Sequence, residues 1–423
     1  MKKGYTLIIP QMAPMQFDLA ETAFKNAGYN VSLMPSVDKK AVETGLKYIN
    51  NDACYPAIVT LGQIISALKS GKFDLNKTAV MMTQTGGGCR ASNYIALLRK
   101  ALKDLHMEQI PVVSLSYLGI EKNPGFKFTP KLIMGFAMAV LYGDLFMRVV
   151  NRVRPYELEK GSANRLYEKW NEIARENVVD RNWLTFKKNV REIVKSFDSL
   201  PINEDLRKPK VGVVGEILVK YHPNANNDIV KIIEKEGGEA VVPDLMDFLA
   251  YCLKNSDFNY EKLAGTKKMQ KISRLGLNII YALRKPVDNA LKASKRFDAP
   301  LHIDEIAKKA EKITSLGTQC GEGWFLTGEM MELIDSGTEN IVCLQPFACL
   351  PNHIVGKGMI KPLRQHNPHT NIVAIDYDPG ASEVNQLNRI KLMMATAHKN
   401  LEKKQQEVER VLNDALSTKK ASL

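Results

Sequence analysis

Four of the six cysteines in this chain of 423 residues stand near glycine or proline, in loops where a thiolate could bind a metal. They are Cys54 in DACYPA, Cys89 in TGGGCRAS, Cys320 in TQCGEG and Cys349 in FACLPN. Structural zinc sites and thioredoxin-type redox sites both favour closely spaced CxxC pairs, which this sequence lacks. Four single thiolates can close a [4Fe–4S] cluster, whereas three would leave one iron open to a substrate.

The loop before Cys89 is built from three glycines: Gly86, Gly87 and Gly88. Glycines let the backbone approach a bulky group closely and leave amide N–H donors unhindered, so we interpret this run as cofactor-binding. The helix expected after it would favour thiolates and a negatively charged cluster. A tight turn with a buried free cysteine is one competing interpretation. A phosphate-binding loop is a second, but the Lys-Ser/Thr pair of a P-loop does not follow.

Two acidic side chains are candidates for proton transfer at the same site. Glu322 follows Cys320 between two glycines, and Glu216 lies at the end of a predicted strand in VVGEIL. The remaining cysteines are more typical of packed thiols, because Cys343 falls inside an apolar strand and Cys252 on a predicted helix.

Alternating strands and helices would position these residues. The pattern predicts an α/β fold with two Rossmann-like parallel-sheet lobes, over 1–125 and 206–423, and a helical segment over 126–205 between them. A helical insertion is expected over 245–313 in the second lobe, and a helix over 353–364 after its last cysteine.

The four cysteines occupy equivalent places in the two lobes. Cys54 precedes a predicted helix and Cys89 follows the next strand, and Cys320 and Cys349 repeat that arrangement. Ligands of open α/β sheets collect at the carboxyl ends of the strands. We therefore expect all four thiols to meet in one crevice between the domains.

Composition narrows the class of protein. Hydrophobic residues make up 45% and charged residues 25%, which excludes a disordered, collagenous or disulfide-scaffold protein. The net charge of +13 comes without a nucleic-acid-binding motif, so we expect no nucleic-acid partner. The apolar stretch over 132–150 is interrupted by Asp144 and Arg148, and no signal-peptide core opens the chain. These features predict no membrane association and a cytoplasmic protein, whose thiols stay reduced.

Six segments carry a resemblance to a known family: NDACYPAIVTLGQ, QTGGGCRASNY, GEILVKYHPNANN, GEGWFLTGEM, QPFACLPNHIVGKGMI and AIDYDPGASEVNQLNRI. Together they resemble the 2-hydroxyacyl-CoA dehydratase-like iron–sulfur proteins, specifically the acyl-CoA dehydratase activase-related branch. The resemblance covers nearly the whole chain.

The resemblance implies Rossmann-like domains around an oxygen-sensitive [4Fe–4S] cluster in an anaerobic system. It also implies a separate ATP-hydrolysing activase, with a cluster of its own, that supplies single low-potential electrons. Cys54, Cys89 and Cys349 match the cluster-binding loops. The pseudo-repeat nominates Cys320 as the fourth ligand, while the family motif also places Cys343 close by. Related double-cubane [8Fe–9S] proteins use six cysteines, a version that this chain has enough cysteines to form.

The chain also departs from the family. Dehydratases of this family have two different subunits, whereas this sequence is one chain without an activase domain or an identifiable CoA pocket. The expected function is therefore a reductase- or dehydratase-like component acting on a small molecule, with a CoA thioester as one option and a homodimer as one assembly. The alternative is a non-catalytic small-molecule-binding or electron-carrying scaffold with a structural metal site.

Overall fold

The structure is a computed structural model and describes residues 4–34, 39–50, 52–116, 121–123 and 125–421. It contains two four-stranded sheets, and every strand pair in them is parallel. The first sheet has the order β2-β1-β3-β4 and the second the order β6-β5-β7-β8. Both lobes therefore use the same order of second, first, third and fourth strand, as two Rossmann-like lobes should.

The strands are short and mostly buried. Those of the first sheet are β1 (Thr6–Ile9), β2 (Asn30–Leu33), β3 (Thr78–Thr83) and β4 (Val112–Leu115). Those of the second are β5 (Lys210–Gly215), β6 (Glu239–Val241), β7 (Asn340–Pro346) and β8 (Asn371–Tyr377). The two central strands of each sheet are almost continuously apolar because helices cover both faces.

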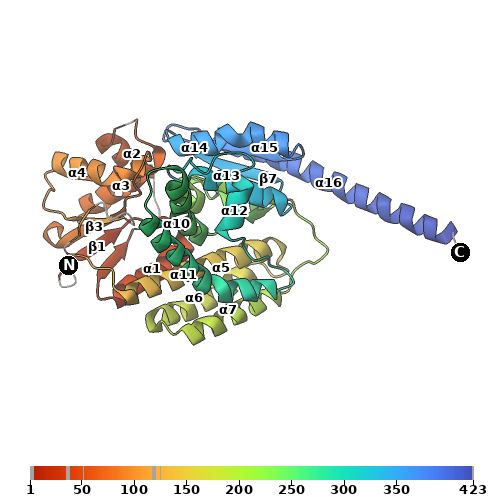
Figure 1. Cartoon of the computed structure of the whole chain (residues 1–423), viewed down its shortest axis with the longest axis horizontal. Coiled ribbons are helices and arrows are strands. Elements are labelled where there is room, and N and C mark those ends of the chain that lie inside the picture. The colour runs from red at the N-terminus through yellow and green to blue at the C-terminus, as the bar shows by residue number, and fades with distance from the viewer. Residues whose placement is uncertain (1–3, 35–38, 51, 117–120, 124, 422–423) are drawn as a thin grey trace.

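Helices of three groups surround the sheets (Figure 1). The first lobe has α1 (Pro14–Asn26), α2 (Lys39–Tyr48), α3 (Tyr55–Lys69) and α4 (Tyr94–Asp104). The middle segment has α5 (Pro130–Val153), α6 (Ser162–Asp180) and α7 (Trp183–Asp198). The second lobe has α8 (Ile217–Tyr221), α9 (Ile229–Lys235), α13 (Gly323–Asp335), α14 (Leu350–Val355), α15 (Ile360–His366) and α16 (Glu383–Ala421), with α10 (Leu245–Lys262), α11 (Lys267–Lys292) and α12 (Ile303–Ala310) as its insertion.

The helix expected over 353–364 is wrong as a single element. The chain forms α14, leaves helical geometry at Gly356 and starts α15 only after a 3-10 turn. Glycines at 356 and 358 lower the helix propensity of this stretch, which explains the break.

Helix α5 joins the two lobes. Its first turn is fixed by Thr129, whose hydroxyl accepts a hydrogen bond from the Leu132 N–H. One hydrophobic core runs from the first sheet through α5, α6 and α7 into the second sheet. The segment Pro130–Tyr156 is the one part of the described chain apolar and long enough to cross a membrane, with a mean hydropathy of 1.6, but 72% of that apolar window is buried inside the protein. Such burial is typical of a helix in the core of a protein.

Figure 1 shows how the parts lie in space. The first lobe (red and orange) lies beside the second lobe (blue), and α5, α6 and α7 lie beneath both. The helices α10 and α11 cross the front between the lobes, and the distal half of α16 extends away from the body. The carboxyl ends of the first sheet consequently face elements of the second lobe.

Candidate metal centre

Three of the candidate cysteines lie where helices begin. Cys54 caps α3, whose first turn contains Pro56, and Cys349 caps α14. Cys89 caps the 3-10 turn Arg90–Ser92. Free N–H groups and the positive end of the helix dipole favour negative charge at such positions, which opposes the cost of burying a thiolate there.

Two hydrogen bonds join the cysteine loops of the two lobes. The backbone N–H of Tyr55 donates to the carbonyl of Phe347 at 3.0 Å. The Arg90 guanidinium donates to the carbonyl of Ala348 at 2.8 Å. Both donors directly follow a cysteine of the first lobe, and both acceptors lie just before Cys349. The three loops are therefore held against one another across the lobe boundary.

The three glycines before Cys89 permit a further close approach. Gly86 and Gly87 have φ angles of 85° and 72°, in the left-handed region that favours glycine. A Cβ atom on Gly88 would lie 3.0 Å from the Sγ atom of Cys320. The backbone of the first lobe therefore also lies close to Cys320, at a position where Gly88 has no side chain to intervene.

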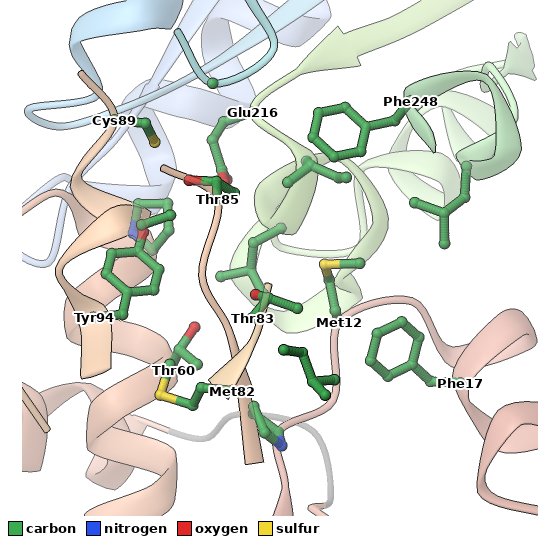
Figure 2. A pocket seen from close by; sticks show the side chains of 18 of the residues that line it. Met12, Phe17, Thr60, Met82, Thr83, Thr85, Cys89, Tyr94, Glu216 and Phe248 are labelled. Atoms are coloured by element: carbon green, nitrogen blue, oxygen red, sulfur yellow. The ribbon is translucent and has the colours of Figure 1, made fainter. Parts of the chain in front are cut away.

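A cavity of about 240 Å³ lies at this meeting point (Figure 2). Cys54, Cys89 and Cys349 line it, while Cys320 is exposed beside it, next to the lining glycines. Figure 2 shows the Cys89 sulfur and the Glu216 carboxylate pointing into the same space. Three thiols from two lobes therefore line one shared volume.

Both glutamates predicted from the sequence also line the cavity, and both are buried. The Glu216 carboxylate accepts a hydrogen bond from the Val219 N–H at 3.0 Å, and that of Glu322 accepts one from the Ile217 N–H at 2.9 Å. Burial, reinforced by the charge of Glu322, raises the pKa of Glu216 to about 8. Burial also raises the pKa of Glu322. Burial and the mutual repulsion of the two carboxylates therefore favour a proton on this pair inside the cavity.

The thiols have raised pKa values for related reasons. Burial, followed by the charge of Glu322, raises the pKa of Cys89 to about 12 and that of Cys349 as well. Burial raises the pKa of Cys54, which the Tyr94 hydroxyl partly counteracts. The protein alone thus keeps these thiols neutral, and a cation bound between them would supply the charge that holds thiolates.

Two interactions at the site have no signal in the sequence. The Lys220 ammonium donates to the Glu329 carboxylate at 2.7 Å, and both side chains are buried next to the cavity glutamates. The Tyr94 hydroxyl lies 3.2 Å from the Cys54 sulfur. Each pair joins segments distant in the chain, so only the folded structure reveals it. The ion pair gives Glu329 a structural role.

The other two cysteines do not line the cavity. Cys343 is fully buried in β7, with its sulfur 3.6 Å from the side-chain oxygen of Asn352. Cys252 packs against the core formed by α10 and its neighbours, and burial raises its pKa to about 12. Both are the packed thiols that the sequence indicated. The ring of His353 lies 2.8 Å from the carbonyl of Cys349, so it supports the loop.

The candidate donors do not form a site for a single metal ion. Among the described residues, no three His, Cys, Asp or Glu side chains lie close enough together to hold a single metal ion. A tetrahedral zinc with Zn–S bonds of about 2.3 Å would need sulfurs about 3.8 Å apart. A cluster distributes its thiolates over several iron atoms, so wider spacing around a shared volume is compatible with it.

Comparisons with known proteins add no relative. No protein-family model matches the chain, and no curated protein matches its sequence. The residues, the geometry described above and the resemblance of the six segments are therefore the basis for a proposed function.

Proposed function

We propose that this chain is the cluster-binding component of an ATP-dependent, low-potential electron-transfer system. It would receive electrons from a separate activase ATPase and pass them to a small molecule bound in the cavity. The observation that carries the proposal is the convergence of Cys54, Cys89 and Cys349, from two lobes, on one cavity that also contains two buried glutamates. A cytoplasmic location goes with this function, because the thiols must stay reduced.

Cys54, Cys89 and Cys349 would hold a [4Fe–4S] cluster, with Cys320 as the fourth ligand across Gly88. Such a cluster supplies one-electron chemistry at low potential. A double-cubane cluster is less well supported, because Cys252 and Cys343 lie outside the cavity lining.

The protein's own groups would handle the proton. Reduction of an organic substrate consumes a proton with each electron when neutral product is formed. Burial favours the protonated form of Glu216, and its Oε2 atom accepts a hydrogen bond from the Val219 N–H. Glu322 is fixed by the Ile217 N–H, so both carboxyl groups keep a defined position at the cavity wall. Glu216 is the proposed proton donor and Glu322 its partner.

Metal analysis of anaerobically purified protein tests the proposal. We expect about four iron and four acid-labile sulfide per chain, with broad visible absorbance. Replacement of Cys54, Cys89 or Cys349 by Ser should remove most of the iron. Cys343→Ser is the matched control and should retain it, because its sulfur lies in the strand core.

The same measurement separates the alternatives. Zinc alone, or no metal, would contradict the proposal and favour a non-catalytic small-molecule-binding protein. A cluster that survives Cys320→Ser would indicate three protein ligands and an open iron, whereas its loss would indicate four ligands and favour an electron carrier.

A further inference from the structure

The cavity extends well beyond the cysteines, along the carboxyl edge of the first sheet. The last residue of every strand in that sheet lines it: Ile9, Leu33, Thr83 and Leu115. Elements from outside the sheet close the other side, including Phe136 on α5 and Phe248 on α10. This is the place where open α/β sheets bind small molecules.

The wall of this extension is apolar. Met12, Phe17, Phe24 and Met82 contribute to it from the first lobe. Figure 2 shows Met12, Phe17 and Phe248 on the side away from Cys89. A ligand occupying this part of the cavity would bury apolar surface, which is the main source of affinity in such pockets.

Charge is scarce around the cavity. Arg90 is the one cation among the described lining residues, and it stands at the cysteine end, where its guanidinium donates to the Ala348 carbonyl. The Glu21 carboxylate accepts a hydrogen bond from the Leu33 N–H at 3.2 Å. A nucleotide thioester carries several phosphate charges, which need more than one cation. The lining therefore disfavours the charged part of such a molecule.

One polar group in the cavity wall indicates how a ligand would be oriented. The Thr85 hydroxyl oxygen is buried and has no hydrogen-bond partner among the described residues. Figure 2 places Thr85 beside Glu216, between the cysteine end and the apolar end. A carbonyl or hydroxyl on the ligand could satisfy this group.

The volume limits the size of the ligand. An apolar cavity of about 150 Å³ accommodates benzene, which has six heavy atoms. Scaling to the whole cavity of about 240 Å³, whose cysteine end the proposed cluster would share, sets an upper limit of about ten heavy atoms inside the cavity, such as one aromatic ring with a short side chain.

We infer that the site takes an uncharged, apolar small molecule with a single hydrogen-bonding group, held between the first sheet, α5 and α10 with that group at Thr85. This inference names the substrate class of the proposed function and rests on it, because the reducing end of the cavity is the cysteine end.

Calorimetric binding of two probes to the anaerobically purified protein tests the inference. The neutral probe is 4-phenyl-2-butanone, and the charged probe is the coenzyme A thioester of 3-phenylpropanoic acid. We expect the ketone to bind at least about tenfold more tightly than the thioester. Arg90 is the one cation among the described lining residues, and its guanidinium already donates to the Ala348 carbonyl, so the phosphates of the thioester would lack partners. Equal binding of both probes, or no binding of the ketone at millimolar concentration, would overturn the inference.

Two variants locate the ketone in the cavity. Thr83→Phe places a ring where the ligand should lie, on a side chain that is exposed at the end of β3, and should weaken binding at least about tenfold. Thr83→Val is the matched control, because it keeps the shape without adding a ring. Thr85→Val should weaken binding about two- to tenfold, whereas Thr85→Ser should preserve it. Unchanged melting temperatures would establish that the variants fold, and unchanged ketone affinity in Thr83→Phe would refute the location.

The outcome is separable from that of the metal analysis. Ketone binding by a protein without iron would leave this inference standing and remove the proposed function. A protein that contains iron but does not bind the ketone would leave the proposed function standing and remove this inference.

Discussion

The buried ion pair of Lys220 and Glu329 supports a prediction that can be worked through in numbers. The Nζ and Oε1 atoms are 2.7 Å apart, and the side chains are 3% and 2% exposed. The Lys220 ammonium also lies 4.6 Å from the centre of the Tyr221 ring. Because both side chains are almost fully buried, Lys220→Met should leave the Glu329 carboxylate buried without its cation.

Loss of one partner from such a pair lowers the free energy of unfolding by about 3–5 kcal/mol. For a lobe of roughly 200 residues, each kcal/mol shifts the melting temperature by about 2–4 °C. Lys220→Met should therefore lower the melting temperature by about 6–20 °C in scanning calorimetry. Its double variant with Glu329→Leu removes both charges and should recover most of that loss.

Two results would refute this reasoning. A single Lys220→Met variant that melts within about 2 °C of the parent would mean that the pair contributes little. A double variant that is as unstable as the sum of the two single variants would mean that the charges do not interact. Lys231→Met is a suitable control, because Lys231 is paired with Asp228 on the surface and should change the melting temperature little.

Three further predictions concern the site and the joint between the lobes. Gly88→Ala should lower iron content, because its Cβ would lie 3.0 Å from the sulfur of Cys320. Tyr94→Phe removes a hydroxyl that lies 3.2 Å from the sulfur of Cys54. Loss of one hydrogen bond of about 1 kcal/mol corresponds to about 40 mV, so the reduction potential of the cluster should fall by about that amount. The iron content should not change. Burial, reinforced by the charge of Asp244, raises the pKa of Asp144 from 3.8 to about 8. Between these two pH values the folded state binds a proton that the unfolded state has lost. The free energy of unfolding should therefore fall as pH rises across that range, by up to about 1.4 kcal/mol per pH unit. Asp144→Asn should flatten this dependence in urea titrations at several pH values.

Matched controls make these outcomes decisive. Gly380→Ala should leave iron content unchanged, because its new Cβ would meet only Asp378 at an ordinary 3.4 Å. An unaltered potential in the Tyr94→Phe protein would contradict a ligand role for its neighbouring cysteine. A pH dependence that persists unchanged in the Asp144→Asn protein would mean that another buried group dominates, and the exposed Asp104→Asn variant should behave as the parent.

The sequence was sufficient for the parallel sheets and for the loops that carry the cysteines. Both depend on local signals: continuous apolar strands between helices, Pro56 at a helix start, and the glycines before Cys89. The pairing of Lys220 with Glu329 was not predictable, because the two residues are 109 positions apart and nothing in either segment specifies the partner. The contact of the Tyr94 hydroxyl with the Cys54 sulfur was not predictable for the same reason.

The apolar extension of the cavity was also beyond sequence reasoning, for a different physical reason. Its lining comes from strand ends, α1, α5 and α10, where an apolar residue has the same pattern whether it fills a core or faces a cavity. Phe17 and Phe248 fit either interpretation. Only the packing of α10 across the first lobe decides which apolar residues are left with free space beside them.

A site divided between two lobes couples its occupancy to their closure. One hydrophobic core connects the lobes through the middle helices, whereas the cysteine loops themselves are joined by the Tyr55–Phe347 and Arg90–Ala348 hydrogen bonds, each of which contributes about 1 kcal/mol. For the proposed function, a group bound by cysteines of both lobes would stabilise the closed arrangement by mass action, since an open arrangement would retain only part of the ligand set. The apolar extension of the cavity also has walls from both lobes, so the same closure would exclude water from it. One conformational equilibrium would then govern retention of the metal group and access of the small molecule, which explains why both sites should lie at the lobe boundary instead of inside either sheet's own core.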